Sequence, residues 1–312
     1  MESRTVIIAN PAARSGRLGR ELEAIRHLVE GVLGPVVLMT TTRPREAEAM
    51  VEQLPPGTDR VIGIGGDGTL NELVCGLAHR PDDLPLGLIP FGSGNDLARA
   101  LRISSNVRES VALLGRCQPV SIDTGEVTWT DSDGSSRRRF VNAVGIGLDA
   151  WSAHYAPRYK GWPLGVGYSV AVLKALREWI PAGASIREQA TGRVLHNGPL
   201  MFMTVGNAQD SGGGYRLNPH ARLRDGLLDA CMVEGITRWR ALRMLPTART
   251  GAHLNAREVR YEQVATLDLD TDRGLPIHTD GEVCTLEGRK ISISVHPGSL
   301  TVLMDPAHEN EI

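Results

Sequence analysis

The stretch that most constrains the fold of this chain is a glycine-rich turn between two different apolar patterns. The turn reads Gly65-Gly66-Asp67-Gly68-Thr69 and follows a short continuous apolar run at 61–64, which is typical of a buried strand. After the turn, apolar residues recur in 70–77 at the i, i+3, i+4, i+7 spacing of a helix. The pattern predicts a strand, a tight turn and a helix, with the glycines where a phosphate group can meet a helix N-terminus.

The carboxylate of Asp67 narrows what this turn can bind. It would repel a phosphate group unless a metal ion or a ribose hydroxyl binds it. A phosphate-binding turn with an acidic side chain therefore indicates a nucleotide, and we expect ligand chemistry rather than packing to hold Asp67. The alternative is a plain tight turn in which the glycines only supply positive φ angles.

A second turn of the same kind follows about one strand-and-helix unit later. The segment 90–99, PFGSGNDLAR, comes after the strand-like run 86–89 and begins a helix. Asn95 or Asp96 is a suitable N-cap, so the segment can also be an ordinary capped helix start.

Taken in order, GGDGTLNE and PFGSGNDLAR resemble the diacylglycerol and sphingosine kinase superfamily of lipid kinases, and the resemblance can be followed over about residues 5 to 300. Its other pieces are Asn10-Pro11, Arg14-Ser15-Gly16, Thr41, Asp123-Thr124-Gly125, Asn142, Gly147-Leu148-Asp149-Ala150, Gly206-Asn207, Gly212-Gly213-Gly214, Asp225-Gly226-Leu227-Leu228-Asp229 and Asp280-Gly281-Glu282.

The resemblance implies a set of residues around an ATP molecule. They are Asn10, Thr41, Gly65, Gly66, Asp67, Gly68, Thr69, Asn71, Glu72, Ser93, Asn95 and Asp96. Ser93 stands where many members have threonine, and its hydroxyl keeps the phosphate contact. Arg14 and Arg17 either neutralise phosphate charge or are solvated loop arginines.

For catalysis, the resemblance assigns the base that deprotonates the acceptor hydroxyl to Glu282. Asp280 beside it, and Asp67 in the first turn, complete the catalytic set, because one carboxylate of a pair can take up a proton while the other holds a metal ion. The sequence alone equally allows an Asp-Gly hairpin turn with an exposed glutamate.

The resemblance also implies a structural Mg²⁺ ion, bound by the Asp225 carboxylate and by the backbone carbonyls of Arg222 and Leu227. Oxygen ligands suit this cation. The alternative is a type I′ turn without an ion.

Aromatic residues gather in one stretch of this aromatic-poor chain. Mixed with His154, Arg158 and Lys160, they suit a bilayer interface or the mouth of a lipid pocket, although loop aromatics of this kind also pack between domains. They are Trp151, Tyr155, Tyr159, Trp162 and Tyr168. In the next helix, Val170, Leu173, Leu176 and Trp179 recur at helical spacing, which predicts a core-facing stripe.

Residues 1–122 are predicted to form a Rossmann-like α/β nucleotide-binding domain, because predicted strands and helices alternate along them. We expect strands at 5–9, 36–40, 60–64, 86–89 and 120–122, and helices at 18–33, 44–53, 70–77 and 107–114, with another helix beginning in the segment 90–99. Residues 123–298 show short alternating runs and two helices, at about 167–179 and 238–253. The resemblance makes this second domain a β-sandwich for the lipid substrate and returns residues 299–312 to the first domain.

Composition agrees with a globular enzyme. Hydrophobic residues make up 41% and charged residues 22%, and the formal net charge of −2 gives no basic field for nucleic acid. The four cysteines lack metal-ligand spacing and suit reduced thiols. We expect a cytoplasmic protein, peripheral to the membrane, that is able to form a homodimer.

The sequence therefore predicts an ATP- and Mg²⁺-dependent kinase that phosphorylates a neutral lipid alcohol, with diacylglycerol first among the acceptors. Two alternatives stay open. One is an NAD kinase-like or other small-alcohol kinase, because those enzymes share the GGDGT turn. The other is a catalytically silent lipid- or nucleotide-binding regulator with the same fold.

Overall fold

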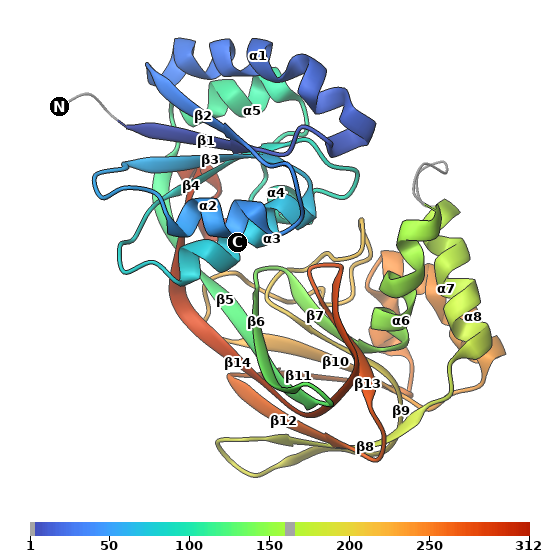
Figure 1. The fold of residues 1–312 in the computed structure, drawn as a ribbon. Helices are drawn as coiled ribbons and strands as arrows, with labels where there is room; N and C mark the ends of the chain where they lie inside the picture. The colour runs from blue at the N-terminus through green and yellow to red at the C-terminus, as the bar shows by residue number, and fades with distance from the viewer. Residues whose placement is uncertain (1–3, 160–165) are drawn as a thin grey trace. The chain divides into compact units, whose positions relative to one another are not determined.

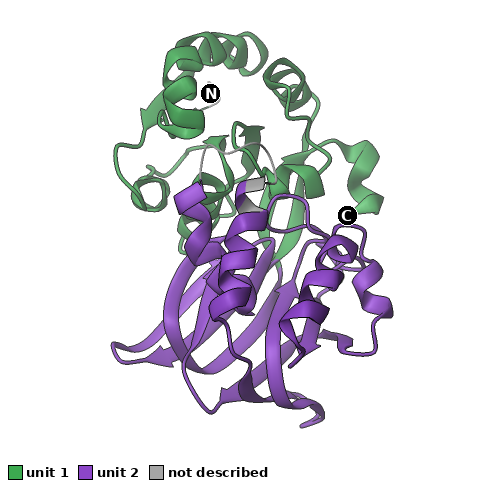
Figure 2. Cartoon of the chain, turned by 90° about the vertical axis from the view of Figure 1, so that its right-hand side faces the viewer, with its two compact units in different colours: residues 1–123, 298–312 green, residues 124–297 purple. Residues whose placement is uncertain are grey.

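The computed structural model describes residues 4–159 and 166–312. The chain forms two compact units: unit 1 contains residues 1–123 and 298–312, and unit 2 contains residues 124–297 (Figure 2). It passes between the units within two strands, β5 (Gln118–Asp131) and β14 (Glu282–Met304). Two residues of the aromatic stretch discussed above, Lys160 and Trp162, lie outside the described residues, as does the side chain of Tyr168.

Unit 1 alternates strands and helices, as the sequence predicts. Its elements are β1 (Thr5–Ala9), α1 (Ala13–Leu33), β2 (Val36–Thr40), α2 (Glu46–Glu52), β3 (Arg60–Gly65), α3 (Asp67–Ala78), β4 (Leu86–Pro90), α4 (Asp96–Ala100), α5 (Val107–Leu114), the start of β5, the end of β14 and η4 (Pro306–Glu311).

The sheet of unit 1 is parallel, in the order β2-β1-β3-β4-β14. Every residue of β1 and β4 is buried, as expected for strands covered on both faces. Helices α1 and α5 cover one face of the sheet, and α2 and α3 cover the other (Figure 1). This arrangement leaves the turns after β3 and β4 side by side at the carboxyl edge of the sheet, where α/β proteins bind ligands.

Unit 2 is rich in antiparallel strands. Besides parts of β5 and β14, its elements are β6 (Gly134–Phe140), β7 (Ala143–Gly147), α6 (Leu148–Tyr155), η1 (Ala156–Tyr159), α7 (Val166–Glu178), β8 (Ala182–Glu188), β9 (Val194–Gly206), β10 (Leu228–Glu234), α8 (Arg238–Met244), η2 (Leu245–Arg249), η3 (Ala252–Asn255), β11 (Val259–Val264), β12 (Thr266–Thr271) and β13 (Leu275–Thr279).

Six of these strands pair in a closed ring, β7-β9-β8-β12-β14-β13. Strands β10 and β11 extend the ring from β9, and β5 and β6 extend it from β14. Buried side chains such as Ile146, Met203 and Ile277 form one core inside unit 2. The α/β class of unit 1 and the β-rich class of unit 2 are those predicted from the sequence.

Two predicted helices differ from the observed ones. The helix expected at 44–53 begins only at Glu46, because Arg45 before it has a left-handed φ of 64°. The helix expected at 238–253 ends at Met244 and continues as 3-10 turns, since Pro246 cannot donate a backbone hydrogen bond. In the described part of the chain, no helix combines the length and the apolar character that crossing a membrane requires.

Candidate active site

The two glycine-rich turns of unit 1 touch each other backbone to backbone. A Cβ atom added to Gly92 would lie 2.5 Å from the Cα of Gly66, and one added to Gly66 would lie 3.0 Å from the Cα of Gly92. The amide of Phe91 donates to the carbonyl of Gly65 at 2.6 Å. Glycine is therefore required at both positions, because any side chain would push the two turns apart.

The side chain of Asp67 connects the two turns by hydrogen bonds. Its Oδ1 accepts the amide of Asp96 at 2.6 Å, and its Oδ2 accepts the amide of Asn95 at 2.8 Å. The expectation that only ligand chemistry holds Asp67 is therefore wrong, since its carboxylate is part of the architecture. These two bonds fix the position of the carboxylate at the junction of the turns.

Asn95 does not cap the following helix. Its backbone is left-handed, with φ 55°, and its side chain bonds the amide of Gly92 at 2.8 Å and the carbonyl of Gly92 at 3.1 Å. The Asp96 carboxylate pairs with Arg99 at 2.6 Å. Asn95 thus shapes the second turn, while Ser93 at its tip is exposed.

Arg14 belongs to this junction, whereas Arg17 does not. The guanidinium of Arg14 donates twice to the carbonyl of Gly92, at 2.9 and 3.2 Å, and lies over the ring of Phe91. Arg17 pairs with Glu21 at 2.7 Å, and its side chain is 56% exposed. Arg17 is therefore a solvated arginine, which was one of the two alternatives. Arg14 contributes a positive charge beside the second turn.

The first strand also reaches the glycine-rich turn. The Asn10 amide nitrogen donates to Thr69 Oγ1 at 3.4 Å. Gly65 permits this contact, because a Cβ there would come within 2.6 Å of the Thr69 side chain. Thr41 follows β2 and is 9% exposed. Asn10, Thr41 and Thr69 thus lie after three neighbouring strands, as a shared binding edge requires.

Two other predicted nucleotide ligands, Glu72 and Asn71, have partners within unit 1. The Glu72 carboxylate accepts the amides of Arg45 at 2.9 Å and Ala47 at 3.1 Å, and so caps α2, which has no side-chain cap of its own. Asn71 is 1% exposed within α3 and accepts from the Cys75 thiol. Both side chains hold α3 and its surroundings in place.

In unit 2, Asp280 holds the segment that connects β6 to β7. Its Oδ2 accepts the amide of Val141 at 3.0 Å, and its Oδ1 accepts the amides of Asn142 at 2.8 Å and Ala143 at 2.9 Å. Its own amide donates back to the carbonyl of Ala143 at 2.9 Å. Three backbone donors therefore use this carboxylate, which fixes the connection between β6 and β7.

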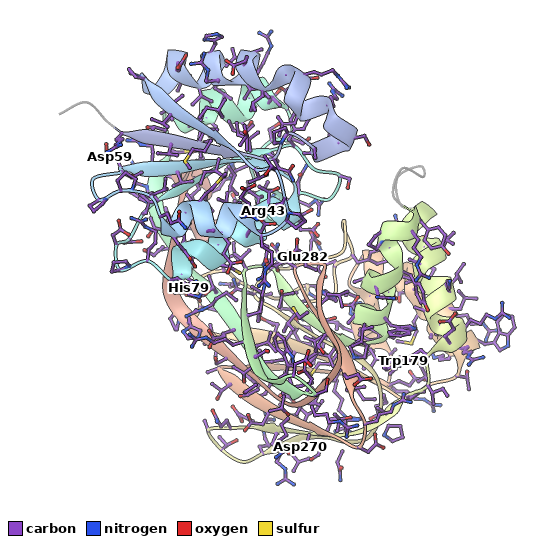
Figure 3. The ribbon with its side chains drawn as sticks, in the orientation of Figure 1. Arg43, Asp59, His79, Trp179, Asp270 and Glu282 are labelled. Atoms are coloured by element: carbon purple, nitrogen blue, oxygen red, sulfur yellow. The ribbon has the colours of Figure 1, made fainter. Side chains whose placement is uncertain are left out.

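Glu282 follows that turn at the start of β14 (Figure 3). Its side chain is 41% exposed, and Oε2 lies 3.6 Å from Nη2 of the buried Arg138. The carboxylate is thus accessible to a substrate hydroxyl, next to a positive charge.

A buried His-Asp pair, which the sequence analysis missed, supports the same turn. The amide of Gly281 donates to His278 Nδ1 at 3.1 Å, so Nε2 carries the proton and donates to Asp149 Oδ2 at 3.0 Å. Thr204 also donates to Asp149, at 3.2 Å. Gly145 makes room for the pair, since a Cβ there would overlap both side chains. Only the three-dimensional pairing of β7 with β13 reveals the link, because Asp149 and His278 are 129 residues apart.

Next to Asp149, unit 2 contains an apolar cavity of about 80 Å³. Its lining comes mainly from α6, α7, α8 and β9, and includes Leu148, Val172, Leu176, Phe202, Ala241 and Leu242. Its few polar side chains include Asp149 and His253. Burial lowers the pKa of His253, which therefore stays neutral near pH 7, and burial raises the pKa of the adjacent Cys231 thiol to about 12. The cavity is therefore suited to an uncharged, apolar ligand.

Of the predicted Mg²⁺ ligands, Asp225 is exposed, and its Oδ1 accepts the amide of Leu227 at 3.0 Å. Gly226 has a φ of 71°, whereas Asp225 is not left-handed. A type I′ turn needs positive φ at both central residues, so the turn is of another type, while the choice between a turn with and without an ion stays open. Burial raises the pKa of the neighbouring Asp229 carboxyl, which is fully buried.

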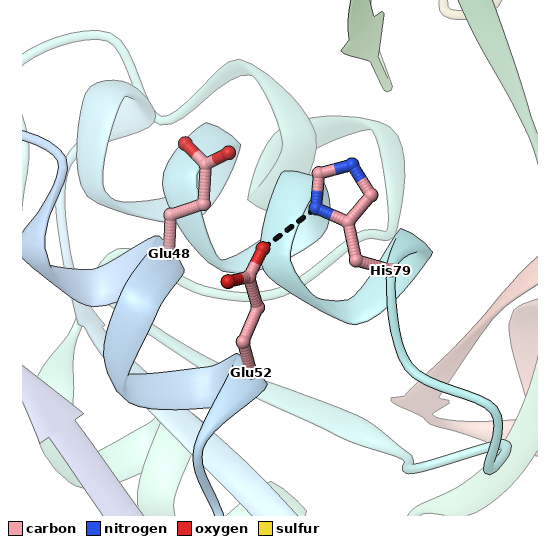
Figure 4. A group of neighbouring side chains, drawn as sticks. All are labelled: Glu48, Glu52 and His79. Atoms are coloured by element: carbon pink, nitrogen blue, oxygen red, sulfur yellow. Dashed lines mark hydrogen bonds and ion pairs between the residues drawn. The ribbon is translucent and has the colours of Figure 1, made fainter.

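A separate surface cluster joins Glu48 and Glu52 of α2 to His79 after α3 (Figure 4). Their ligand atoms lie within 4.8 Å of one another. His79 Nδ1 pairs with Glu52 at 2.7 Å, and both side chains are about half exposed. An ordinary surface ion pair accounts for this arrangement.

Of the aromatic residues described in this stretch, Tyr155 is buried, whereas Trp151 and Tyr159 are partly exposed. Tyr155 is 6% exposed, and its hydroxyl bonds the Glu178 carboxylate. Trp151 is half-buried and stacks on His154 at 5.4 Å. The core stripe predicted for α7 holds for Leu176 and Trp179, whereas Leu173 is 46% exposed.

Comparison with known proteins adds an independent observation. Residues 4–127 match the diacylglycerol kinase catalytic domain, and residues 142–304 match the YegS C-terminal NAD kinase beta sandwich-like domain. The chain is 31% identical over 255 residues to a diacylglycerol kinase of Mycobacterium tuberculosis, covering 81% of this chain and 78% of that protein. It is 30% identical over 247 residues to a YegS-like lipid kinase of Chromohalobacter salexigens, covering 78% and 75%. A diacylglycerol kinase structure from Bacillus anthracis superposes with a TM-score of 0.78 at 22% identity, covering 98% of each chain.

Proposed function

This chain belongs to the family of diacylglycerol kinases and YegS-like lipid kinases, and from that premise we propose that it transfers the γ-phosphoryl group of ATP to the hydroxyl of a neutral lipid. We propose diacylglycerol as the acceptor, which gives phosphatidate as the product. The observation that carries the proposal is the junction of the two glycine-rich turns through Asp67. We infer that unit 1 is the nucleotide-binding domain and unit 2 the lipid-substrate domain.

In this proposal the joined turns bind the phosphate groups of ATP. The N-terminus of α3 supplies backbone donors, Ser93 supplies an exposed hydroxyl, and Arg14 supplies positive charge. The oxygen donors of the Asp67 carboxylate would suit Mg²⁺, which neutralises phosphate charge when it is bound with ATP. The second ion would be held by Asp225 with the carbonyls of Arg222 and Leu227, an all-oxygen donor set.

Glu282 accepts the proton of the lipid hydroxyl as that oxygen attacks the γ-phosphorus. Its accessible carboxylate supports this role, and Arg138 orients it. Asp280 acts through the backbone, by fixing the turn on which Glu282 stands.

The apolar cavity of unit 2 supports a lipid acceptor. An acyl chain is uncharged and flexible, and it can be bound by the aliphatic walls that α6, α7 and α8 provide. A nucleotide such as NAD would bring charges that this lining cannot pair. We therefore place an acyl chain of the acceptor in this cavity and propose that the protein works at the cytoplasmic face of a membrane.

The test is a phosphorylation assay with labelled ATP, Mg²⁺ and a panel of acceptors. Diacylglycerol in mixed micelles should give an organic-soluble labelled product, whereas a sphingoid base, an isoprenoid alcohol and NAD should react more slowly. Faster labelling of NAD would replace the proposal with an NAD kinase. No labelling of any acceptor would favour a silent regulator, and equilibrium binding of ATP would then separate a nucleotide binder from an inert fold.

A further inference from the structure

Helix α8 has two chemically different faces. Ala241, Leu242 and Met244 line the apolar cavity of unit 2. Trp239, on the same helix, is 76% exposed, the largest exposed fraction among the large hydrophobic side chains of the described residues. Burying an indole normally stabilises a protein, so an indole left in water indicates a contact outside the folded chain.

The charge around Trp239 is positive. The segment 236–257 contains five arginines and no aspartate or glutamate, in a protein with a formal net charge of −2. Arg240 is paired with Glu258 at 3.0 Å. Arg238 and Arg243 are exposed and make no ion pair with any residue in the described ranges 4–159 and 166–312. Two arginines thus flank the indole with their charges available to an external anion.

The neighbouring helix adds exposed apolar surface. Helices α7 and α8 pack against each other beside the strands of unit 2 (Figure 1). Leu173 of α7 is 46% exposed, and Ile180 just beyond α7 is 61% exposed. Lys174, also on α7, adds a further positive charge.

We propose that the outer side of α8, formed by Arg238, Trp239 and Arg243, docks on a bilayer that carries anionic lipid. An indole suits the interface between headgroups and acyl chains, and arginines next to it pair with lipid phosphates. The inner side of the same helix is a wall of the cavity. Docking would therefore bring the cavity, to which the proposed function assigns an acyl chain, next to the membrane that supplies the lipid, and in this respect the inference rests on that function.

Vesicle flotation of the full chain, without ATP or acceptor, tests the docking. The vesicles contain either phosphatidylcholine alone or phosphatidylcholine with about a third phosphatidylglycerol. Wild type should bind the anionic vesicles more tightly. Arg238→Gln and Arg243→Gln should each weaken that binding about fivefold, and Trp239→Ala about tenfold, whereas Trp239→Phe should keep most of it.

Arg187→Gln and Val194→Ala are the matched controls. These exposed residues face each other on the hairpin of β8 and β9, and Val194 is 49% exposed. Both variants should bind vesicles like wild type. Equal losses in the controls, or unchanged binding of Trp239→Ala, would overturn the proposal, and so would equal binding of wild type to both vesicle types.

Two further measurements separate this proposal from its competitors. Trp239→Ala should keep wild-type activity on a short-chain, water-soluble diacylglycerol but lose it on the same headgroup in vesicles. If no lipid is phosphorylated while vesicle binding persists, the proposed function fails and the docking surface stands. If light scattering shows that Trp239→Ala turns a dimer into a monomer without changing vesicle binding, the surface is a contact between copies and the docking proposal is wrong.

Discussion

Exchanging Asp280 and Glu282 separately should give two different kinds of defect. Asp280 accepts three backbone amides at 2.8 to 3.0 Å, whereas Glu282 makes one ion pair at 3.6 Å and is 41% exposed. Hydrogen bonds to a charged acceptor contribute about 1.5–3 kcal/mol each. An exposed ion pair contributes about 0–1 kcal/mol. The stability of unit 2 should therefore depend on Asp280 and hardly on Glu282.

The Asp280→Asn variant keeps an oxygen for the amides of Asn142 and Ala143, but it presents an NH₂ group to the amide of Val141. One charge-assisted bond is lost and two become neutral, which should cost about 2–4 kcal/mol. Asparagine tolerates the left-handed φ of 49° at this position, so backbone strain does not contribute. Urea unfolding should shift to lower concentration, and hydrogen exchange should accelerate in a peptide covering 140–144.

The Glu282→Gln variant should unfold like wild type, within about 0.5 kcal/mol. Its kcat with saturating lipid and MgATP should fall by about 10² to 10⁴, because glutamine cannot accept the hydroxyl proton. The reasoning is refuted if Asp280→Asn keeps wild-type exchange and unfolding. It is equally refuted if Glu282→Gln loses less than about threefold in kcat and keeps the wild-type pH profile.

Three other changes test separate parts of the structure. Gly92→Ala should force the two turns apart, raising KM for ATP and lowering stability by more than about 1 kcal/mol, whereas Gly31→Ala, which meets open space in α1, should be neutral or stabilising. The fold raises the pKa of Asp229, so the contribution of this carboxyl to stability is fully present below its unfolded pKa and is lost as the pH rises through its folded pKa. The Asp229→Asn variant cannot ionise at this position. Its melting temperature relative to wild type should therefore be higher at pH 8 than at pH 4.5. Ala241→Trp should fill the cavity and lower kcat/KM for long-chain lipids about tenfold or more, with little change for short-chain ones.

The sequence predicts unit 1 well because its signals are local. Each strand of a parallel sheet is a short apolar run, and each helix repeats its apolar residues, so the strands at 5–9 and 36–40 coincide with β1 and β2. The structural use of Asp67 could not be predicted in this way. Its partner amides lie 28 and 29 residues further along the chain, and only the adjacency of β3 and β4 brings them within reach.

Unit 2 is predicted less completely because its ring depends on pairings between distant segments. No strand is predicted from the sequence at Ala182–Glu188, Val259–Val264 or Leu275–Thr279, although β8 and β13 are members of the ring. Strand β13 is buried at all five positions, including His278, so it lacks the alternation that marks a half-exposed strand. A histidine in such a strand carries no sequence signal of its link to Asp149.

The Asp-Gly pairs at Asp67 and Asp280 show that a sequence motif does not by itself identify a catalytic residue. Asp67 and Asp280 each accept backbone amides from a neighbouring segment, so the fold itself requires an aspartate at both places. Replacing either aspartate should therefore alter the fold as well as any chemistry. Glu282 differs, because its side chain is 41% exposed and lies 3.6 Å from Arg138. Among the three acidic residues, Glu282 is therefore the one to which we assign a catalytic role as a proposal, and the Glu282→Gln variant tests it.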